Sequence, residues 1–225
     1  MELGGMNLND YFEENDIMIR ISEMGEETFS DKREEFLTNI FLCAAKALKQ
    51  FHEFSVHLDI KSKNFVLKKE QNLYEPLQLC KLIDFNSSII IPKGEYRIAQ
   101  NLAGNISLAP EVYEEQIANN GLKVNRKVDI WAFGVMMISM MNFRFQNIPR
   151  NLPLATGHII NNLLPTYLSN NSYNTQIDRV LKGCMQLNAT FRPSISAIVN
   201  FLEGNCQRFR YEARRNILNI CDDQN

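Results

Sequence analysis

The sequence predicts a mainly α-helical fold of the α+β class with one small β-hairpin, and three observations support this. Apolar side chains recur every three or four residues through residues 36–51, as in a long amphipathic helix. The run IWAFGVMMISMM, residues 130–141, is apolar on every face and predicts a helix buried on all sides. Two β-rich runs, residues 65–69 and 77–85, flank a polar turn and predict the hairpin.

The rest of the chain fits the same class. After Asp129 the pattern is helical, with loop residues at 142–153 and 168–174, and Ser194 is a candidate N-cap for a further helix. No repeat, linker or block of like charge divides the sequence. We therefore expect one domain.

Composition excludes several functional classes. The chain has 225 residues, of which 45% are hydrophobic, so it can bury a substantial core. Its formal charge of -2 gives no basic surface for nucleic acid or an anionic membrane. The apolar run at 130–141 is too short to cross a bilayer. We expect no nucleic-acid partner and no membrane insertion.

The five cysteines predict reduced thiols. Their number is odd, they are widely spaced, and they form no C-x-x-C pair. The N-terminal MELGGMNLND has no basic stretch followed by an apolar run, so no signal peptide is visible. We expect an intracellular protein, cytoplasmic or cytoskeletal, whose thiols are mostly small buried hydrophobes: Cys43, Cys80, Cys184, Cys206 and Cys221.

Five short motifs follow one another in a specific order. HLDIKSKN, residues 57–64, is similar to the catalytic loop H-R-D-x-K-x-x-N, and DFN at 84–86 is similar to D-F-G. APE at 109–111, DIWAFGV from Asp129 and FRPS around Arg192 match three later signatures of the same family. Each motif alone is weak evidence, but the ordered set is strong.

Through these motifs the chain resembles the C-terminal lobe of a eukaryotic protein kinase of the Ser/Thr type, over essentially its whole length. It is also weakly similar to monopolar-spindle-type and protist kinases. The resemblance treats residues 1–225 as one kinase-like C-lobe containing a hinge-like segment 1–8, a catalytic-type loop 57–64, an activation segment 84–111, a helical subdomain 112–202 and a C-terminal tail 203–225.

The resemblance assigns the chemistry to four side chains. Asp59 would accept or orient the substrate hydroxyl proton, and Lys61 would contact the transferring phosphate. Lysine at this position favours Ser/Thr specificity. Asn64 and Asp84 would supply oxygen ligands for Mg²⁺.

A nucleotide site is implied in the same way. The Glu2 carbonyl and the Gly4 amide would meet the adenine edge, with Val66 beneath the ring. The implied cofactor is ATP with Mg²⁺, bound weakly or as a vestige.

Other positions are expected to be structural. Glu111 and Arg192 would form a buried ion pair that ties the activation segment to the helical subdomain. Asp129 would bond backbone amides of residues 57–59, and His57 would be a scaffold residue rather than a base or a metal ligand. The methionines of residues 135–141 would pack in the core.

Several residues depart from the family pattern. Leu58 replaces the arginine of H-R-D, which removes a receptor for a phosphate on the activation segment. Asn86 replaces the glycine of D-F-G, and asparagine is the non-glycine residue that best tolerates positive φ. Asn105 and Ser107 replace the usual Thr and Tyr, which affects the docking of a peptide substrate.

The sequence shows no Gly-rich phosphate loop, no strand lysine and no helix-C glutamate, so the resemblance implies that the N-lobe is absent from this chain. We therefore expect a catalytically inactive, pseudokinase-like binding or structural subunit of a larger assembly. The alternative is the C-lobe of an active ATP-dependent Ser/Thr kinase whose N-lobe is missing from this chain. A third possibility is weak nucleotide binding without phosphotransfer.

A partner surface is also expected. The faces that an N-lobe covers in a two-lobed kinase would lie open, and exposed apolar surface of that extent normally marks an interface. We expect another protein chain, or an N-terminal extension, to cover the surface around Met1, Leu3, Val66, Leu82 and Phe85.

Overall fold

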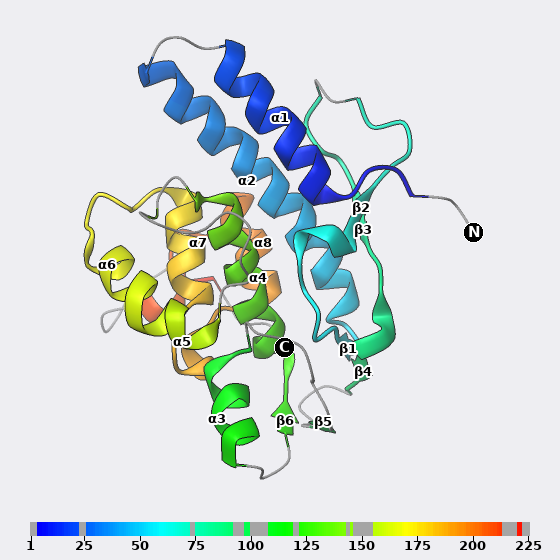
Figure 1. Ribbon diagram of the computed structural model, residues 1–225, viewed down its shortest axis with the longest axis vertical. Helices are drawn as coiled ribbons and strands as arrows, with labels where there is room; N and C mark the ends of the chain where they lie inside the picture. The colour runs from blue at the N-terminus through cyan, green and yellow to red at the C-terminus, as the bar shows by residue number, and fades with distance from the viewer. Residues whose placement is uncertain are drawn as a thin grey trace.

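The computed structural model describes residues 4–22, 26–72, 75–91, 97–99, 108–118, 122–142, 145, 155–212 and 220–221. Two long helices, α1 (Leu8–Ser22) and α2 (Glu26–Phe51), lie side by side (Figure 1). Helix α2 confirms the amphipathic pattern of residues 36–51. Helix α1 was not predicted, although its N-terminus carries a capping signal: Asn7 Oδ1 accepts hydrogen bonds from the amides of Asn9 and Asp10.

Helix α4 (Arg126–Met140) is the buried centre of the molecule; it packs on α7 (Gln176–Cys184), while α8 (Ile195–Leu202) packs on α2 (Figure 1). Its N-cap is Asn125, whose side chain accepts a hydrogen bond from the Lys127 amide. The predicted core role of the methionines in and just after α4 is confirmed, because these side chains are at most 4% exposed: Met136, Met137, Met140 and Met141. Among the described residues, no helix combines the length and apolarity needed to cross a membrane.

In Figure 1, α5 (Thr156–His158), α6 (Leu164–Ser169) and α7 lie to the left of α4, and α3 (Pro110–Ala118) lies below it. The predicted N-cap at Ser194 is confirmed, since its side chain accepts a hydrogen bond from the Ala197 amide. A helix at residue 110 was not predicted. The helices are α3 (Pro110–Ala118), α5 (Thr156–His158), a π-helical turn η4 (Ile159–Leu163), α6 (Leu164–Ser169), α7 (Gln176–Cys184) and α8 (Ile195–Leu202).

Among the described residues, three antiparallel strand pairs complete the fold. The predicted hairpin is confirmed: β2 (Phe65–Leu67) pairs with β3 (Cys80–Leu82), with Phe65 opposite Leu82. Residues 5–7 run along its free edge, where the Gly5 amide bonds the Leu67 carbonyl at 2.9 Å. Two further pairs join segments distant in sequence: β1 (Ser55–Val56) with β4 (Ile89–Ile90), and β5 (Arg97–Ala99) with β6 (Leu122–Val124).

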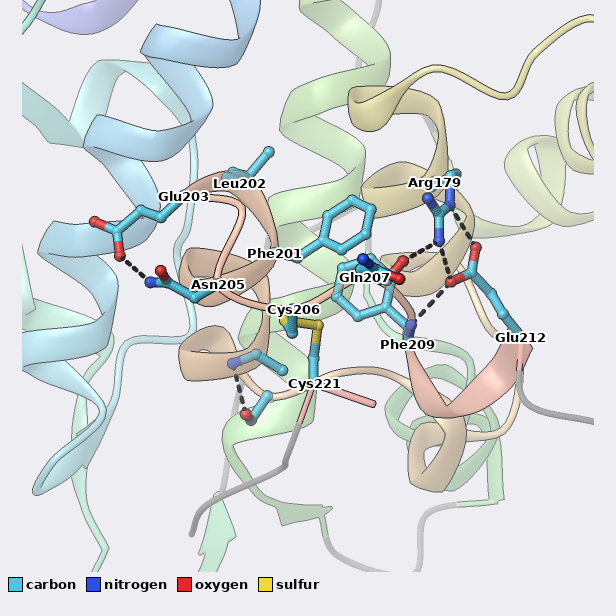
Figure 2. Close-up of a disulfide and its surroundings, with 12 residues drawn as sticks. Arg179, Phe201, Leu202, Glu203, Asn205, Cys206, Gln207, Phe209, Glu212 and Cys221 are labelled. Atoms are coloured by element: carbon cyan, nitrogen blue, oxygen red, sulfur yellow. Dashed lines mark hydrogen bonds and ion pairs between the residues drawn. A yellow bond between two sulfur atoms is a disulfide. The ribbon is translucent and has the colours of Figure 1, made fainter. Parts of the chain in front are cut away.

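The prediction of reduced thiols is wrong for two cysteines. Cys206 and Cys221 form a disulfide with their Cα atoms 5.2 Å apart (Figure 2). The Cys221 amide also bonds the Arg208 carbonyl at 2.8 Å, which holds residues 220–221 against the loop after α8. Sequence spacing could not reveal this contact because the fold creates it. The other cysteines, Cys43, Cys80 and Cys184, are buried and form no disulfide, as predicted.

Candidate active site

The loop at residues 57–64 is anchored by a carboxylate from α4. Asp129 is fully buried; its Oδ2 accepts from the His57 amide at 2.7 Å and its Oδ1 accepts from the Leu58 amide at 2.8 Å. Oδ2 is also 2.9 Å from His52 Nε2. The expected role of Asp129 is thus confirmed for residues 57 and 58. The Asp59 amide donates instead to His57 Nδ1, at 3.3 Å.

His57 is a scaffold residue, as predicted. Its Nδ1 accepts from the Asp59 amide, and its Nε2 lies 3.0 Å from the Ile83 carbonyl. Both bonds are satisfied by the neutral tautomer that carries its proton on Nε2. The ring meets Phe51 and Phe85 edge-on, at centroid distances of 5.4 and 5.7 Å. His57 therefore connects the loop to the segment that carries Asp84.

Asp59, Lys61 and Asn64 form one cluster. Asp59 Oδ2 accepts from Lys61 Nζ at 2.7 Å and from Asn64 Nδ2 at 3.1 Å, and Asn64 Nδ2 also donates to the Asp59 carbonyl at 2.8 Å. The Asp59 side chain is 25% exposed and that of Lys61 is 49% exposed. Within the described part of the chain Asp59 Oδ1 makes no hydrogen bond, so it can accept one from a substrate hydroxyl.

Asn64 and Asp84 are brought close by the hairpin. The Ile83 amide donates to the Asn64 carbonyl at 2.9 Å, which places the residue before Asp84 against Asn64. Asp84 has a left-handed backbone, with φ 63° and ψ 67°, a conformation that costs energy for a non-glycine residue. Asn86 Nδ2 donates to its Oδ1 at 2.9 Å. The strained turn therefore orients an exposed carboxylate.

These two side chains fit Mg²⁺. Asn64 uses its amide nitrogen as a donor to Asp59, and its Oδ1 has no hydrogen-bond partner among the described residues. The described part of the chain contains no cluster of three or more His, Cys, Asp or Glu side chains that could hold a metal. One carboxylate and one amide oxygen suit Mg²⁺, because this ion keeps several water ligands and shares phosphate oxygens with its nucleotide.

The predicted adenine contacts are described only in part. Glu2 lies outside the described residues. Gly4 packs directly on Val66: a Cβ atom at Gly4 would lie 2.2 Å from Val66 Cγ1, so any larger residue would displace that side chain. Gly4 is exposed and Val66 half-buried. Contact of either residue with a nucleotide stays a prediction.

The Glu111 and Arg192 pair is present, as the resemblance implied. Arg192 donates two parallel hydrogen bonds to the Glu111 carboxylate, at 2.8 and 2.7 Å. Its guanidinium also lies 5.2 Å from the ring centroid of Trp131 in α4. The first turn of α3 is therefore fastened to the centre of the helical subdomain.

The residues that depart from the family pattern have different surroundings. Leu58 is buried, with φ 66°, and Asn86 is exposed at the end of the strained turn. Asn105 and Ser107 lie outside the described residues.

The predicted partner surface is only partly open. Phe85 is 51% exposed, whereas Leu82 is only 9% exposed, because alternate residues of β3 face α2. The expectation of an exposed Leu82 is wrong. Met1 and Leu3 lie outside the described residues.

Sequence reasoning missed two polar residues that frame the site. His52, just after α2, contacts Asp129, and Arg126, at the start of α4, bonds the carbonyls of His52 and Ile91. The predicted helix began after Asp129, whereas α4 begins at Arg126, and this extra turn places Arg126 on the same face as Asp129.

The protein kinase domain model matches residues 6–201. This chain belongs to the protein kinase family. Members of this family use ATP with Mg²⁺. The match covers the catalytic-type loop, the segment from Asp84 and the helices around α4, so the fold class predicted from the sequence is confirmed.

The chain is similar to protein kinases of several organisms. The chain is 26% identical to serine/threonine-protein kinase SKM1 of Saccharomyces cerevisiae, over 69% of this chain and 22% of that protein. It is 28% identical to cold-responsive protein kinase 1 of Arabidopsis thaliana, over 74% of this chain and 44% of that protein. It is 26% identical to serine/threonine-protein kinase Nek1 of Mus musculus, over 89% of this chain and 15% of that protein. This chain spans less than half the length of each of these three proteins.

Proposed function

We propose that this chain provides the catalytic-loop half of an ATP- and Mg²⁺-dependent Ser/Thr protein kinase. One observation carries the proposal: Asp59 is held by Lys61 and Asn64 through one carboxylate oxygen, while the other oxygen has no hydrogen-bond partner within the described residues. A loop that served only as scaffold would have no need to keep an oriented carboxylate that is a quarter exposed. Phosphoryl transfer depends mainly on positioning and charge stabilisation, which such a cluster provides.

Each residue has a distinct role in the proposed reaction. Asp59 Oδ1 would accept a hydrogen bond from the substrate hydroxyl and orient its oxygen for attack. The Lys61 ammonium, 2.7 Å from Asp59 Oδ2, is half-exposed and would offset negative charge that develops on the phosphoryl oxygens. Asn64 Oδ1 and the Asp84 carboxylate would hold Mg²⁺. Bound ATP would supply the phosphoryl group.

The second candidate is the pseudokinase-like binding subunit that the sequence favoured. Leu58 and Asn86 support it, since neither matches the family pattern. In addition, Asn86 Nδ2 donates a hydrogen bond to Asp84 Oδ1, an oxygen that a metal would need. A cluster of exposed apolar side chains also suits a protein partner: Phe54 is 54% exposed, Phe85 51% and Ile90 74%. Another protein chain covering this face is compatible with both candidates.

The deciding experiment measures transfer of labelled γ-phosphate to Ser/Thr peptides. It uses the longest reading frame that contains these residues, as wild type, Asp59→Asn and the matched surface control Glu70→Gln. We expect Asp59→Asn to reduce the rate by about 10²-fold or more, since general-base positioning contributes at least that much, with the control unchanged. Transfer that is absent, or equal in wild type and Asp59→Asn, would reject the kinase proposal and leave the binding subunit.

A second measurement tests the metal site directly. Mg²⁺ with ADP should raise the melting temperature of the wild-type chain, because a ligand that binds only the folded state stabilises it. Asp84→Asn should remove the Mg²⁺-dependent part of that rise. An equal rise in both proteins would show that Asp84 is not a metal ligand.

A further inference from the structure

Arg126 joins two segments that are distant in the sequence. It is the first residue of α4, and its guanidinium donates from Nε to the His52 carbonyl and from Nη2 to the Ile91 carbonyl at 3.0 Å. His52 directly follows the last residue of α2, so its carbonyl belongs to the negative end of that helix. The same cation therefore holds the end of α2 and the end of β4.

Ile91 is fixed from both sides of its backbone. Its side chain is 1% exposed, its amide donates to the Phe54 carbonyl at 3.0 Å, and its carbonyl accepts from Arg126. The chain between Asp84 and Ile91 is also held along its length. Ser88 Oγ donates to the His57 carbonyl at 3.3 Å, and Ile89 and Ile90 pair with β1.

Arg126 and Asp129 lie one helical turn apart, and each bonds the backbone of one of the two segments that form the site. Asp129 holds the amides of His57 and Leu58, and Arg126 holds the end of the segment that carries Asp84. Burial lowers the pKa of Arg126, while the charge of Asp129 raises it, and an arginine remains charged at neutral pH. Leu58 is buried and apolar, so it brings no cation to this segment.

We propose that Arg126 is a positioning residue that sets the placement of the metal ligand Asp84 by anchoring residues 84–91 to α4. The anchor is a built-in cation bonded to backbone carbonyls, and so it requires no phosphate on the segment. This inference rests on the proposed function, because the metal role of Asp84 is part of it.

The experiment compares wild type with Arg126→Ala, Arg126→Lys and the exposed control Arg210→Ala. Two quantities are measured on the folded chain: hydrogen exchange at the Ile91 amide, and the affinity for ADP with and without Mg²⁺ by calorimetry. We expect Arg126→Ala to speed exchange at Ile91 about tenfold and to weaken Mg²⁺-dependent ADP binding about tenfold, with binding in the absence of Mg²⁺ unchanged. Arg126→Lys keeps the charge and is the second variant if Arg126→Ala does not fold. It should restore part of the protection at Ile91 and part of the Mg²⁺-dependent affinity.

Different outcomes separate the two proposals. Unchanged exchange at Ile91 in both Arg126 variants would refute the anchor. Faster exchange with an unchanged Mg²⁺ dependence would show a merely structural role and would overturn the positioning of Asp84. A wild-type chain that binds no Mg²⁺ with ADP would refute the proposed function instead, and exchange at Ile91 alone would then decide whether Arg126 anchors the segment.

Discussion

Arg192 and Glu111 form an ion pair whose two members differ in exposure: the Arg192 side chain is fully buried, whereas 31% of the Glu111 side chain is exposed. The guanidinium also donates to the carbonyls of Lys127, Gln186 and Leu187. The pair is therefore buried on the arginine side only. Loss of Arg192 would remove the donor that these three carbonyls share, while the Glu111 carboxylate could still reach water.

Arg192→Ala should lower the free energy of unfolding by about 3–5 kcal/mol, because it removes a fully buried guanidinium together with its bonds to the Glu111 carboxylate and to three backbone carbonyls. Equilibrium denaturation in urea measures the change. Arg210→Ala is the control; Arg210 is exposed, and its loss should change stability by no more than about 0.5 kcal/mol. Equal midpoints for wild type and Arg192→Ala would show that the pair contributes nothing.

Asp129→Asn should destabilise the chain by about 3 kcal/mol, since an amide offers one acceptor oxygen where the carboxylate serves two backbone amides and His52. The new NH₂ group would face a backbone N–H. Hydrogen exchange at the amides of His57 and Leu58 should rise in parallel. Glu53→Gln, a surface carboxylate-to-amide change, is the control, and the prediction fails if the two variants have the same stability.

Removal of the disulfide with Cys206→Ser and Cys221→Ser should cost about 3 kcal/mol, because the bond closes a loop across 15 residues of sequence and restricts the unfolded chain. Thermal unfolding with and without a reductant measures this. Reductant should lower the melting temperature of wild type and leave the double variant unchanged. A wild-type curve that does not respond to reductant would contradict the prediction.

The Glu212 carboxylate should make stability depend on pH in the acid range. Burial raises its pKa, but hydrogen bonds from Arg179 and the Phe209 amide outweigh burial and hold the pKa below its ordinary value (Figure 2). The stabilisation is therefore fully present above the unfolded pKa of about 4.3 and is lost as pH falls through the folded value. Melting temperatures between pH 3 and 7 should show a shallower acid decline in Glu212→Gln. Parallel declines would refute this.

The candidate site shows how far sequence reasoning reached. The resemblance assigned Asp59, Lys61 and Asn64 to one site, and the structure joins these three side chains by hydrogen bonds. The scaffold role of His57 also followed from the motif. The sequence did not predict the exposed fraction of each side chain, because that depends on which elements pack against it. The expectation that Leu82 is exposed was wrong for this reason.

The sequence by itself determined the family, the long helix α2, the buried helix α4 and the hairpin of β2 and β3. These features depend on local periodicity and on ordered motifs, which are properties of neighbouring residues. Only the tertiary structure decided the contacts between distant segments: the disulfide of Cys206 and Cys221, the pairing of β1 with β4, and the link from Arg126 to Ile91. Such contacts form because burial of the core brings these segments together, and no local pattern in either partner specifies the other.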